Sequence, residues 1–241
     1  MKIKNFTITL LLFIFSTTIC NGQAAILVLI FGDKVASENF HLSLDVGANT
    51  SFYQNAPGDV QIGWNFGLGT HTKISDKFQL VAEFKMISDR SRRNTPKILP
   101  VPNFADSLIS EINTSWSVRY FDVPILVRYS VSDSWHFGTG PQFSFLNQAT
   151  EITELDLKNG NEATINQDIK NSFRSVNYNW AFEVVKSFGK VREGKGLDLR
   201  LRYVMGLSNS FSDNVSLSSN INVLQFIVTI PFIEVPAPKS N

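Results

Sequence analysis

The sequence predicts an all-β fold, an eight-stranded antiparallel up-and-down transmembrane β-barrel. Three observations predict it. Apolar and polar residues alternate with a period of two through most of the chain, which is typical of strands with one apolar and one polar face. Tight turns and long polar segments connect these strands. No later apolar run reaches the length of about 18 residues that a membrane-spanning helix needs.

The length and composition fit one exported domain. The chain has 241 residues, of which 43% are hydrophobic, and its formal net charge of +1 argues against nucleic acid as a partner. Lys2 and Lys4 precede a short apolar run and a small-residue segment, Cys20-Asn21-Gly22, which predicts a cleaved secretory signal peptide. The sequence therefore divides into a signal peptide, a lead-in segment, the barrel and a C-terminal periplasmic tail, at residues 1–22, 23–39, 40–232 and 233–241.

The first three expected strands show an unbroken alternation. In Phe40–Tyr53, Phe, Leu and Val alternate with His, Ser, Asp and Gly. In Val60–Lys73, Trp, Phe and Leu alternate with Asn and Gly, and in Phe78–Ser88 the polar partners are Gln, Glu and Lys. Ser-Asp in the segment Ile74–Lys77 predicts a tight turn between the second and third strands.

The fourth expected strand, Ile112–Ser130, changes phase. Trp116, Val118 and Tyr120 are expected to point outward at even positions, whereas the apolar residues from Val123 onward occupy odd positions. Pro124 lies at this change, and a proline within a strand is typical of a bulge. We therefore expect a bulge near Pro124.

The last four expected strands repeat the first pattern, with aromatic and aliphatic residues on one face and small or charged residues on the other. They are Trp135–Leu146, Phe173–Phe188, Leu197–Ser208 and Ile221–Phe232. Val131–Ser134 is a second tight turn, and the long polar loops are Asp89–Glu111, Asn147–Ser172 and Asn209–Asn220. Because outer-membrane barrels have short periplasmic turns and long outer loops, both chain ends are expected in the periplasm.

The bulk of the apolar face indicates that it meets lipid. It holds most of the Phe residues and all four tryptophans, Trp64, Trp116, Trp135 and Trp180. The lumen of an eight-stranded barrel is too narrow for this bulk, whereas the glycines and ions of the polar face would fit it. Lipid-facing positions also avoid charge, and this face carries almost none; the main exception, Lys186, lies near a strand end. A soluble lipocalin-like barrel with the apolar face inside is the alternative.

The segment Tyr120–Tyr129 and the following Gly138-Thr139-Gly140-Pro141 carry a family resemblance. The run Tyr120-Phe121-Asp122-Val123-Pro124 resembles the aromatic–acidic–aliphatic–proline signature of the PorT-like outer-membrane β-barrel family of Bacteroidota. The resemblance covers most of the chain and implies an outer-membrane location in a Gram-negative cell. Some members of that family serve type IX secretion or gliding, so it implies no single activity.

Ten charged residues are expected inside the barrel by strand parity, five of each sign. Unpaired ions are costly in a confined lumen, so this balance predicts mutual pairing. A salt-bridged filling of the barrel is the main interpretation, and a polar path for small ions is the alternative. The ten are Asp45, Glu83, Lys85, Arg119, Asp122, Arg128, Glu183, Asp198, Arg200 and Arg202.

Two further groups of residues carry site hypotheses. Arg90, Arg92 and Arg93 lie in the second outer loop, where they could contact lipopolysaccharide phosphates above the outer leaflet. His41, His71 and His136 fall near periplasmic strand ends and predict a hydrogen-bond cluster there. No catalytic set, metal motif or cofactor motif is found in the sequence, so we expect no enzyme, metal or cofactor.

The function expected from the sequence is that of an integral outer-membrane β-barrel with an occluded, charge-paired lumen. It would act as a structural or docking component through its loops or its periplasmic face. Its partners would be outer-membrane lipid, lipopolysaccharide and a protein at one of these ends. A narrow porin-like channel is the first alternative, and a lipid A-modifying barrel enzyme is the second.

Overall fold

The computed structural model describes residues 37, 39–100, 109–190 and 195–232. The expected signal peptide, most of the lead-in segment and the periplasmic tail lie outside the described residues, so they stay predictions. Within the described part, no helix combines the length and the apolar character needed to cross a membrane.

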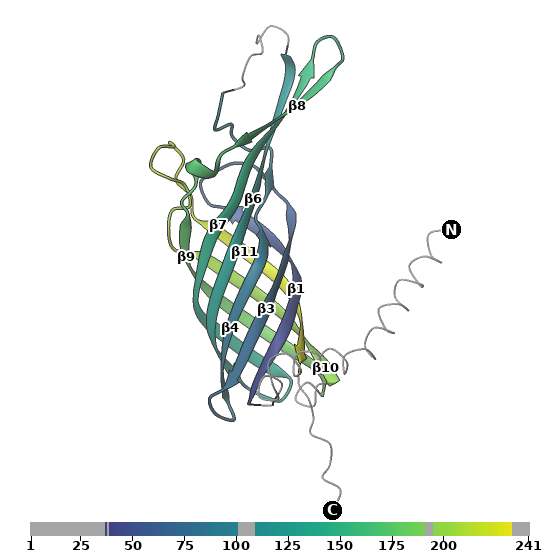
Figure 1. The fold of residues 1–241 in the computed structure, drawn as a ribbon, viewed down its shortest axis with the longest axis vertical. Coiled ribbons are helices and arrows are strands. Elements are labelled where there is room, and N and C mark those ends of the chain that lie inside the picture. Colours follow the sequence, from purple (N-terminus) through teal and green to yellow (C-terminus); the bar gives the residue numbers. More distant parts are fainter. Residues whose placement is uncertain (1–36, 38, 101–108, 191–194, 233–241) are drawn as a thin grey trace, which may run out of the picture.

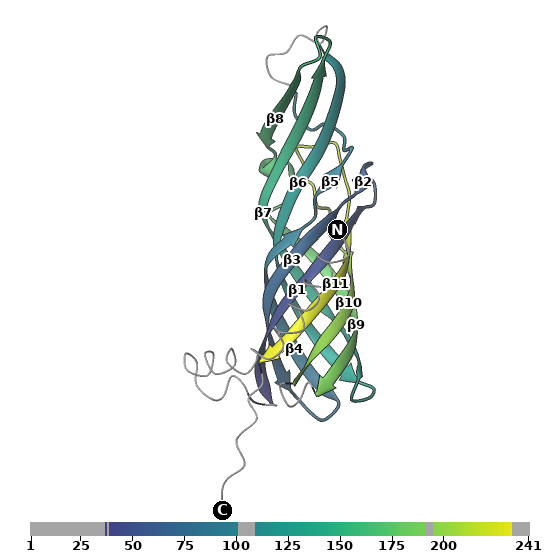
Figure 2. The ribbon, with the colours of Figure 1, turned by 90° about the vertical axis from the view of Figure 1, so that its right-hand side faces the viewer.

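Eight long antiparallel strands of the described chain close into a barrel (Figures 1 and 2). Each strand pairs with the next along the chain, and β11 pairs with β1 to complete the ring. The predicted fold class is therefore confirmed. The strands are β1 (Phe40–Tyr53), β3 (Ile62–Lys73), β4 (Phe78–Asp89), β6 (Ile109–Ser130), β7 (Trp135–Leu157), β9 (Val176–Lys190), β10 (Lys195–Gly206) and β11 (Ile221–Phe232).

Strands β6 and β7 continue beyond the barrel and carry an extension at one end (Figure 2). The extension also contains β2 (Asp59–Val60), β5 (Arg92–Arg93), β8 (Glu162–Asp168) and the short 3-10 helix η4 (Lys170–Ser172). We call this end of the barrel the loop end. The tight turns at residues 74–77 and 131–134 lie at the other end, where β1 begins and β11 finishes, and we call it the turn end.

The observed strands agree with the predicted ones within the barrel and differ beyond it. β1 and β11 have the predicted bounds, but the predicted loop Asn147–Ser172 is wrong. There β7 continues to Leu157, and β8 folds back to pair with it. These strands carry Thr, Glu and Asn on the face that, lower down, meets lipid, so they lack the apolar alternation that identifies a membrane strand.

The apolar face lies outside, as the bulk of its side chains indicates. Trp64 is 70% exposed to the surroundings of the barrel, Trp135 45% and Phe182 48%. Trp116 is an exception that the sequence prediction placed wrongly, since it is only 1% exposed and lies inside the barrel. Unbroken parity places Trp116 on the same face as Asp122 and Arg128, so the error came from the expected change of phase.

The expected change of phase at Pro124 is also wrong. The even-numbered residues of β6 from Thr114 to Arg128 are all buried, so Trp116, Val118 and Tyr120 share the inner face with Asp122. The bulges nearest to Pro124 lie on the neighbouring strands instead. The pairing register shifts between Lys85 and Ser88 of β4 and opposite Arg119–Tyr120, where β7 carries the extra residue. Pro124 stays in register opposite Gln142.

Candidate functional site

The centre of the barrel is a cluster of two carboxylates and two guanidinium groups from three strands. Arg202 Nη2 donates to Glu83 Oε1 at 2.6 Å and to Glu183 Oε2 at 2.7 Å, and its Nη1 donates to Glu83 Oε2 at 2.8 Å. Arg200 Nη2 donates to Glu183 Oε2 at 2.8 Å and also to Glu83. All four side chains are fully buried. Shared and bidentate contacts of this kind fix arginine geometry firmly.

Asp45 and Lys85 extend the cluster across the lumen. Arg200 Nη1 donates to Asp45 Oδ2 at 3.0 Å, and the Thr229 hydroxyl donates to Asp45 Oδ1 at 2.7 Å. Lys85 Nζ lies 3.4 Å from Glu83 Oε2 and 3.9 Å from Asp45 Oδ2. Each ion therefore has at least one partner of opposite sign, which offsets the cost of removing it from water.

Arg128 connects the cluster to the turn end. Its Nη2 donates to Glu183 Oε1 at 2.8 Å, and its Nη1 lies 3.8 Å from Asp198 Oδ2. The Ser187 hydroxyl donates to Asp198 Oδ1 at 2.6 Å. Gly138 makes room for this arrangement, because a Cβ at that position would lie 2.7 Å from Glu183 Cγ. A glycine is therefore needed at position 138 for the Glu183 carboxylate to reach Arg128.

The tenth charge is Arg90 and not Arg119. Arg119 is exposed on the outer face of β6, so its predicted place in the lumen is wrong. Arg90 enters from the loop end, and its Nη2 donates to Asp122 Oδ1 at 2.7 Å and to Ser144 Oγ at 2.9 Å. The other nine predicted lumen residues are buried. We call them, together with Arg90, the charge network, and it contains five carboxylates and five cations.

The predicted lipopolysaccharide contact is corrected by the same observation. Arg90 is 1% exposed and Arg92 is 6% exposed, so neither presents its guanidinium outward. Arg92 lies over the ring of Tyr53 at 5.1 Å and donates to the carbonyl oxygen of Gly58. Arg93 is exposed. The short strand β5 places Arg92 inward and Arg93 outward. The sequence prediction treated Arg90, Arg92 and Arg93 as one polar loop and therefore gave all three the same exposure.

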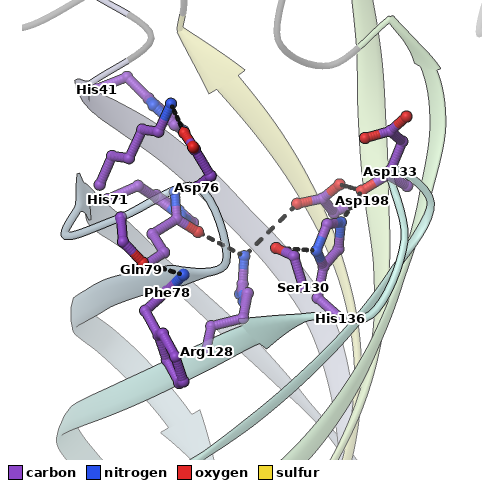
Figure 3. Close-up of a pocket in the computed structure, with 13 residues that line it drawn as sticks. His41, His71, Asp76, Phe78, Gln79, Arg128, Ser130, Asp133, His136 and Asp198 are labelled. Carbon is purple, nitrogen blue, oxygen red and sulfur yellow. Dashed lines mark hydrogen bonds and ion pairs between the residues drawn. The ribbon is translucent and has the colours of Figure 1, made fainter.

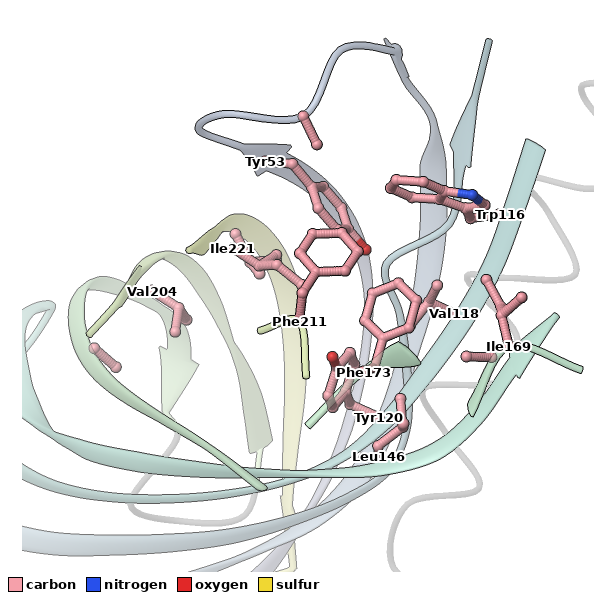
Figure 4. Packing of buried hydrophobic residues seen from close by; sticks show 14 of the residues in the cluster. Tyr53, Trp116, Val118, Tyr120, Leu146, Ile169, Phe173, Val204, Phe211 and Ile221 are labelled. Carbon is pink, nitrogen blue, oxygen red and sulfur yellow. The ribbon is translucent and has the colours of Figure 1, made fainter. Parts of the chain in front are cut away.

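Five aromatic side chains fill the barrel at the loop end, and we call them the aromatic plug (Figure 4). Ring centroids lie 5.6 Å apart for Trp116 and Phe211 and 4.7 Å apart for Phe173 and Phe211. Phe173 and Phe211 come from loops and meet through an isolated β-bridge. The plug consists of Tyr53, Trp116, Tyr120, Phe173 and Phe211.

A buried carboxylate holds a loop segment near the plug. Glu151 is fully buried and accepts hydrogen bonds from the backbone N–H groups of Ile98 at 2.6 Å and Leu99 at 3.2 Å. Ile98 and Leu99 pack against the buried cluster that contains the plug. Sequence reasoning did not identify the plug or Glu151; the only signals were single Phe and Glu residues in otherwise polar segments.

The three histidines gather around a recess of ≈ 90 Å³ at the turn end (Figure 3). His41 and His71 stack with ring centroids 4.7 Å apart, and His71 Nε2 lies 3.0 Å from Ser43 Oγ. His136 contacts the hydroxyls of Ser130 at 2.8 Å and Ser187 at 3.0 Å. Among the described residues, no three His, Cys, Asp or Glu side chains are arranged to hold a metal ion.

The family model for the outer membrane protein beta-barrel domain matches residues 32–212. No curated protein sequence matches the chain.

Among solved structures, the chain is similar to Neisserial surface protein A (NspA), with 10% identity and a TM-score of 0.39 over 81% of this chain and 97% of that one. OprG from Pseudomonas aeruginosa shows 10% identity and a TM-score of 0.38 over 83% and 96% of the two chains. Ail, the attachment invasion locus protein of Yersinia pestis, shows 10% identity and a TM-score of 0.35 over 78% and 94%. The family match covers most of the sequence, and the chain therefore belongs to the outer membrane protein beta-barrel domain family.

Proposed function

We propose that this outer-membrane barrel has an occluded lumen and works as a structural or docking component without catalytic activity. The observation that carries the proposal is the filling of the interior by the charge network and the aromatic plug. A polar path for ions needs groups that water can reach, whereas the central ions are fully buried and bonded to one another. Recognition would then fall to the loop end or the periplasmic face.

The resemblance of Tyr120–Pro124 to the PorT-like family supports a setting for that docking role. We propose type IX secretion or gliding machinery as the assembly that the barrel serves. Asp122, the acidic residue of that segment, bonds to Arg90 inside the barrel. The signature therefore has a structural use in this chain, and a partner would be recognised by other residues.

A narrow channel for small ions or solutes is the second candidate. The recess at the turn end favours it, because this recess enters the barrel toward Arg128 and Asp198. A channel would require the recess to continue past the central cluster and the plug. It predicts ion-selective openings in a planar bilayer, which the occluded barrel does not.

A lipid A-modifying enzyme is the third candidate and has the least support. One arrangement of the described residues resembles a catalytic set. In His136–Ser187–Asp198, the serine hydroxyl lies between the other two groups and donates to the carboxylate. In a Ser-His-Asp triad the histidine lies between the carboxylate and the serine and takes the serine proton, which this order of groups does not allow. Mass analysis of lipid A after expression tests this candidate, and a modified lipid A would revive it.

We also propose outer-membrane lipid and lipopolysaccharide as partners of the outer face. Arg119 and Arg93 are the arginines that support this, because both are exposed near the loop end. Arg119 lies on the outer face of β6, two positions closer to the loop end than Phe121. At this level the outer face changes from apolar to polar residues. Anionic phosphates at that level would interact favourably with a guanidinium group. Association of lipopolysaccharide unchanged in an Arg93→Gln, Arg119→Gln variant would contradict the proposal.

In-cell photo-crosslinking tests the docking role. A photo-reactive residue is introduced at Asn159, in the turn between β7 and β8, at Asp133, in a turn at the turn end, and at lipid-facing Phe182 as the matched control. A protein adduct from Asn159 or Asp133 that is absent from Phe182 supports docking at that end. Adducts to lipid alone from all three positions would contradict it. Residue 103, a further loop position suited to this experiment, lies outside the described residues.

A further inference from the structure

Among the described strands, none pairs with the outer edge of β8. This strand pairs with β7 over Thr150–Asp156 and stands at the end of the strand order of the described sheet. It lies beyond the barrel at the loop end, on the side away from β6 (Figure 1). An unpaired edge offers its N–H and C=O groups to an added strand, and extended peptides are recognised in this way.

The hydrogen bonds that flank β8 show which of its residues face the free edge. Ile169 N donates to Ala149 O at 3.0 Å, and Leu157 N donates to Asn161 O at 2.8 Å. Hydrogen-bonded and non-hydrogen-bonded pairs alternate along an antiparallel ladder, so residues 163, 165 and 167 bond to β7. The backbone groups that point to the free edge are those of Glu162, Thr164, Asn166 and Asp168.

Among the described residues, the edge of β8 carries neither proline nor lysine, and no bulge interrupts it. Natural edges are protected by proline, charged residues, bulges or a covering segment. The charged residues of β8, Glu162 and Asp168, stand only at its two ends. β8 reads Glu-Ala-Thr-Ile-Asn-Gln-Asp and pairs with β7 without a shift of register. Its central residues, Thr164 and Ile165, have high β-propensity. The strand therefore runs without interruption over seven residues that a neighbouring strand can pair with.

The outer face of the extension specifies the charge of that neighbour. Five exposed carboxylates share this face with Thr164 and Asn166. Between Arg119 and the tip of the extension, the described parts of β6, β7 and β8 contribute no lysine or arginine to this face. Like charges on neighbouring strands are destabilising, whereas opposite charges are favourable. We call this surface the acidic face, and its carboxylates are Glu111, Glu154, Asp156, Glu162 and Asp168.

We propose that β8 is a docking edge for an extended segment of a partner protein in which basic and apolar residues alternate. An antiparallel segment would place its lysines or arginines opposite Glu162, Thr164, Asn166 and Asp168, over the acidic face. Its apolar residues would lie beside Ala163 and Ile165, on the half-buried side of β8. The inference rests on the proposed docking role and names the chemistry of the partner that the loop end accepts.

A peptide pair tests the geometry of this edge. The full chain, folded in lipid nanodiscs, is titrated against a labelled heptapeptide of alternating lysine and valine, and binding is followed by fluorescence anisotropy. In the docked register the lysine N–H groups point to β8 and the valine N–H groups point away. N-methylation of two lysine nitrogens should therefore raise Kd by about tenfold or more. N-methylation of two valine nitrogens is the matched control and should leave Kd nearly unchanged.

Variants of β8 test the same point from the protein side. Thr164→Pro removes an N–H that faces the free edge and takes no part in the β7 ladder, so the barrel should fold and peptide binding should be lost. Thr164→Val changes the side chain, keeps this N–H, and should bind the peptide as the wild type does. Equal Kd values for the two methylated peptides, no peptide binding at all, or wild-type binding by a folded Thr164→Pro variant would each overturn the edge site. Ion-selective openings in a bilayer would instead contradict the proposed function and leave these comparisons intact.

Discussion

Replacing Glu183 by glutamine should destabilise the barrel strongly, because this carboxylate holds three guanidinium groups. It accepts six hydrogen bonds, two each from Arg128, Arg200 and Arg202, at 2.7 to 3.2 Å. Glu183→Gln keeps the shape of the side chain but changes the formal charge of the network from zero to +1. Breaking one partner of a buried ion pair costs about 3–5 kcal/mol, so we expect a loss of unfolding free energy in that range.

The assay is equilibrium unfolding in urea, performed on barrels refolded into lipid vesicles and followed by tryptophan fluorescence. The matched control is Asp213→Asn. Asp213 and Arg174 form an ion pair 2.7 Å long, as Glu183 and Arg202 do, but the Asp213 side chain is 90% exposed. Exposed pairs contribute little to stability, so the control should unfold as the wild type does. A loss below about 1 kcal/mol for Glu183→Gln would mean that water reaches the network, and the reasoning for an occluded lumen would be refuted.

Three further predictions follow from the interior. Arg90→Gln should destabilise the barrel by about 3 kcal/mol in the same urea assay, because it leaves the buried Asp122 carboxylate without its ion pair. Arg119→Gln should have little effect. A larger loss for Arg119→Gln than for Arg90→Gln would show that Arg119 lies in the lumen. Gly138→Val should lower the urea midpoint, since its side chain would displace the Glu183 carboxylate, and an unchanged midpoint would show that the lumen has spare room. Brominated lipids should quench Trp64 but not Trp116 in single-tryptophan variants, and equal quenching would place both residues outside.

The barrel itself could be predicted from the sequence because lipid imposes a strict pattern. Every second residue of a spanning strand must be apolar, so β1 and β11 were predicted with the bounds that the structure has. Beyond the lipid this constraint ends, and the β7–β8 hairpin carries polar residues on one face and mixed residues on the other. The hairpin therefore had no signal that distinguished it from a polar loop.

The sequence predicts that the barrel interior holds balanced, paired charges, but it identifies only part of the residues that carry them. Strand parity placed nine charges inside the barrel. The change of phase expected at Pro124, which the structure does not have, put Arg119 inside and Trp116 and Tyr120 outside. The counter-ion that replaces Arg119 is Arg90, at the start of a loop, where parity carries no information. The balance of charge in the lumen was therefore predictable from the sequence. The residue that pairs with Asp122 was not, because it depends on how the loop after β4 enters the barrel.

The most direct measurement of the central claim is the conductance of the refolded full chain in a planar lipid bilayer, with a water-filled porin as the positive control. The charge network and the aromatic plug lie in series along the lumen, so an ion would have to pass both. We predict no resolved ion-selective openings from the wild-type barrel under conditions in which the porin conducts. Steady, ion-selective openings from the wild-type barrel would contradict the occluded lumen and support the channel.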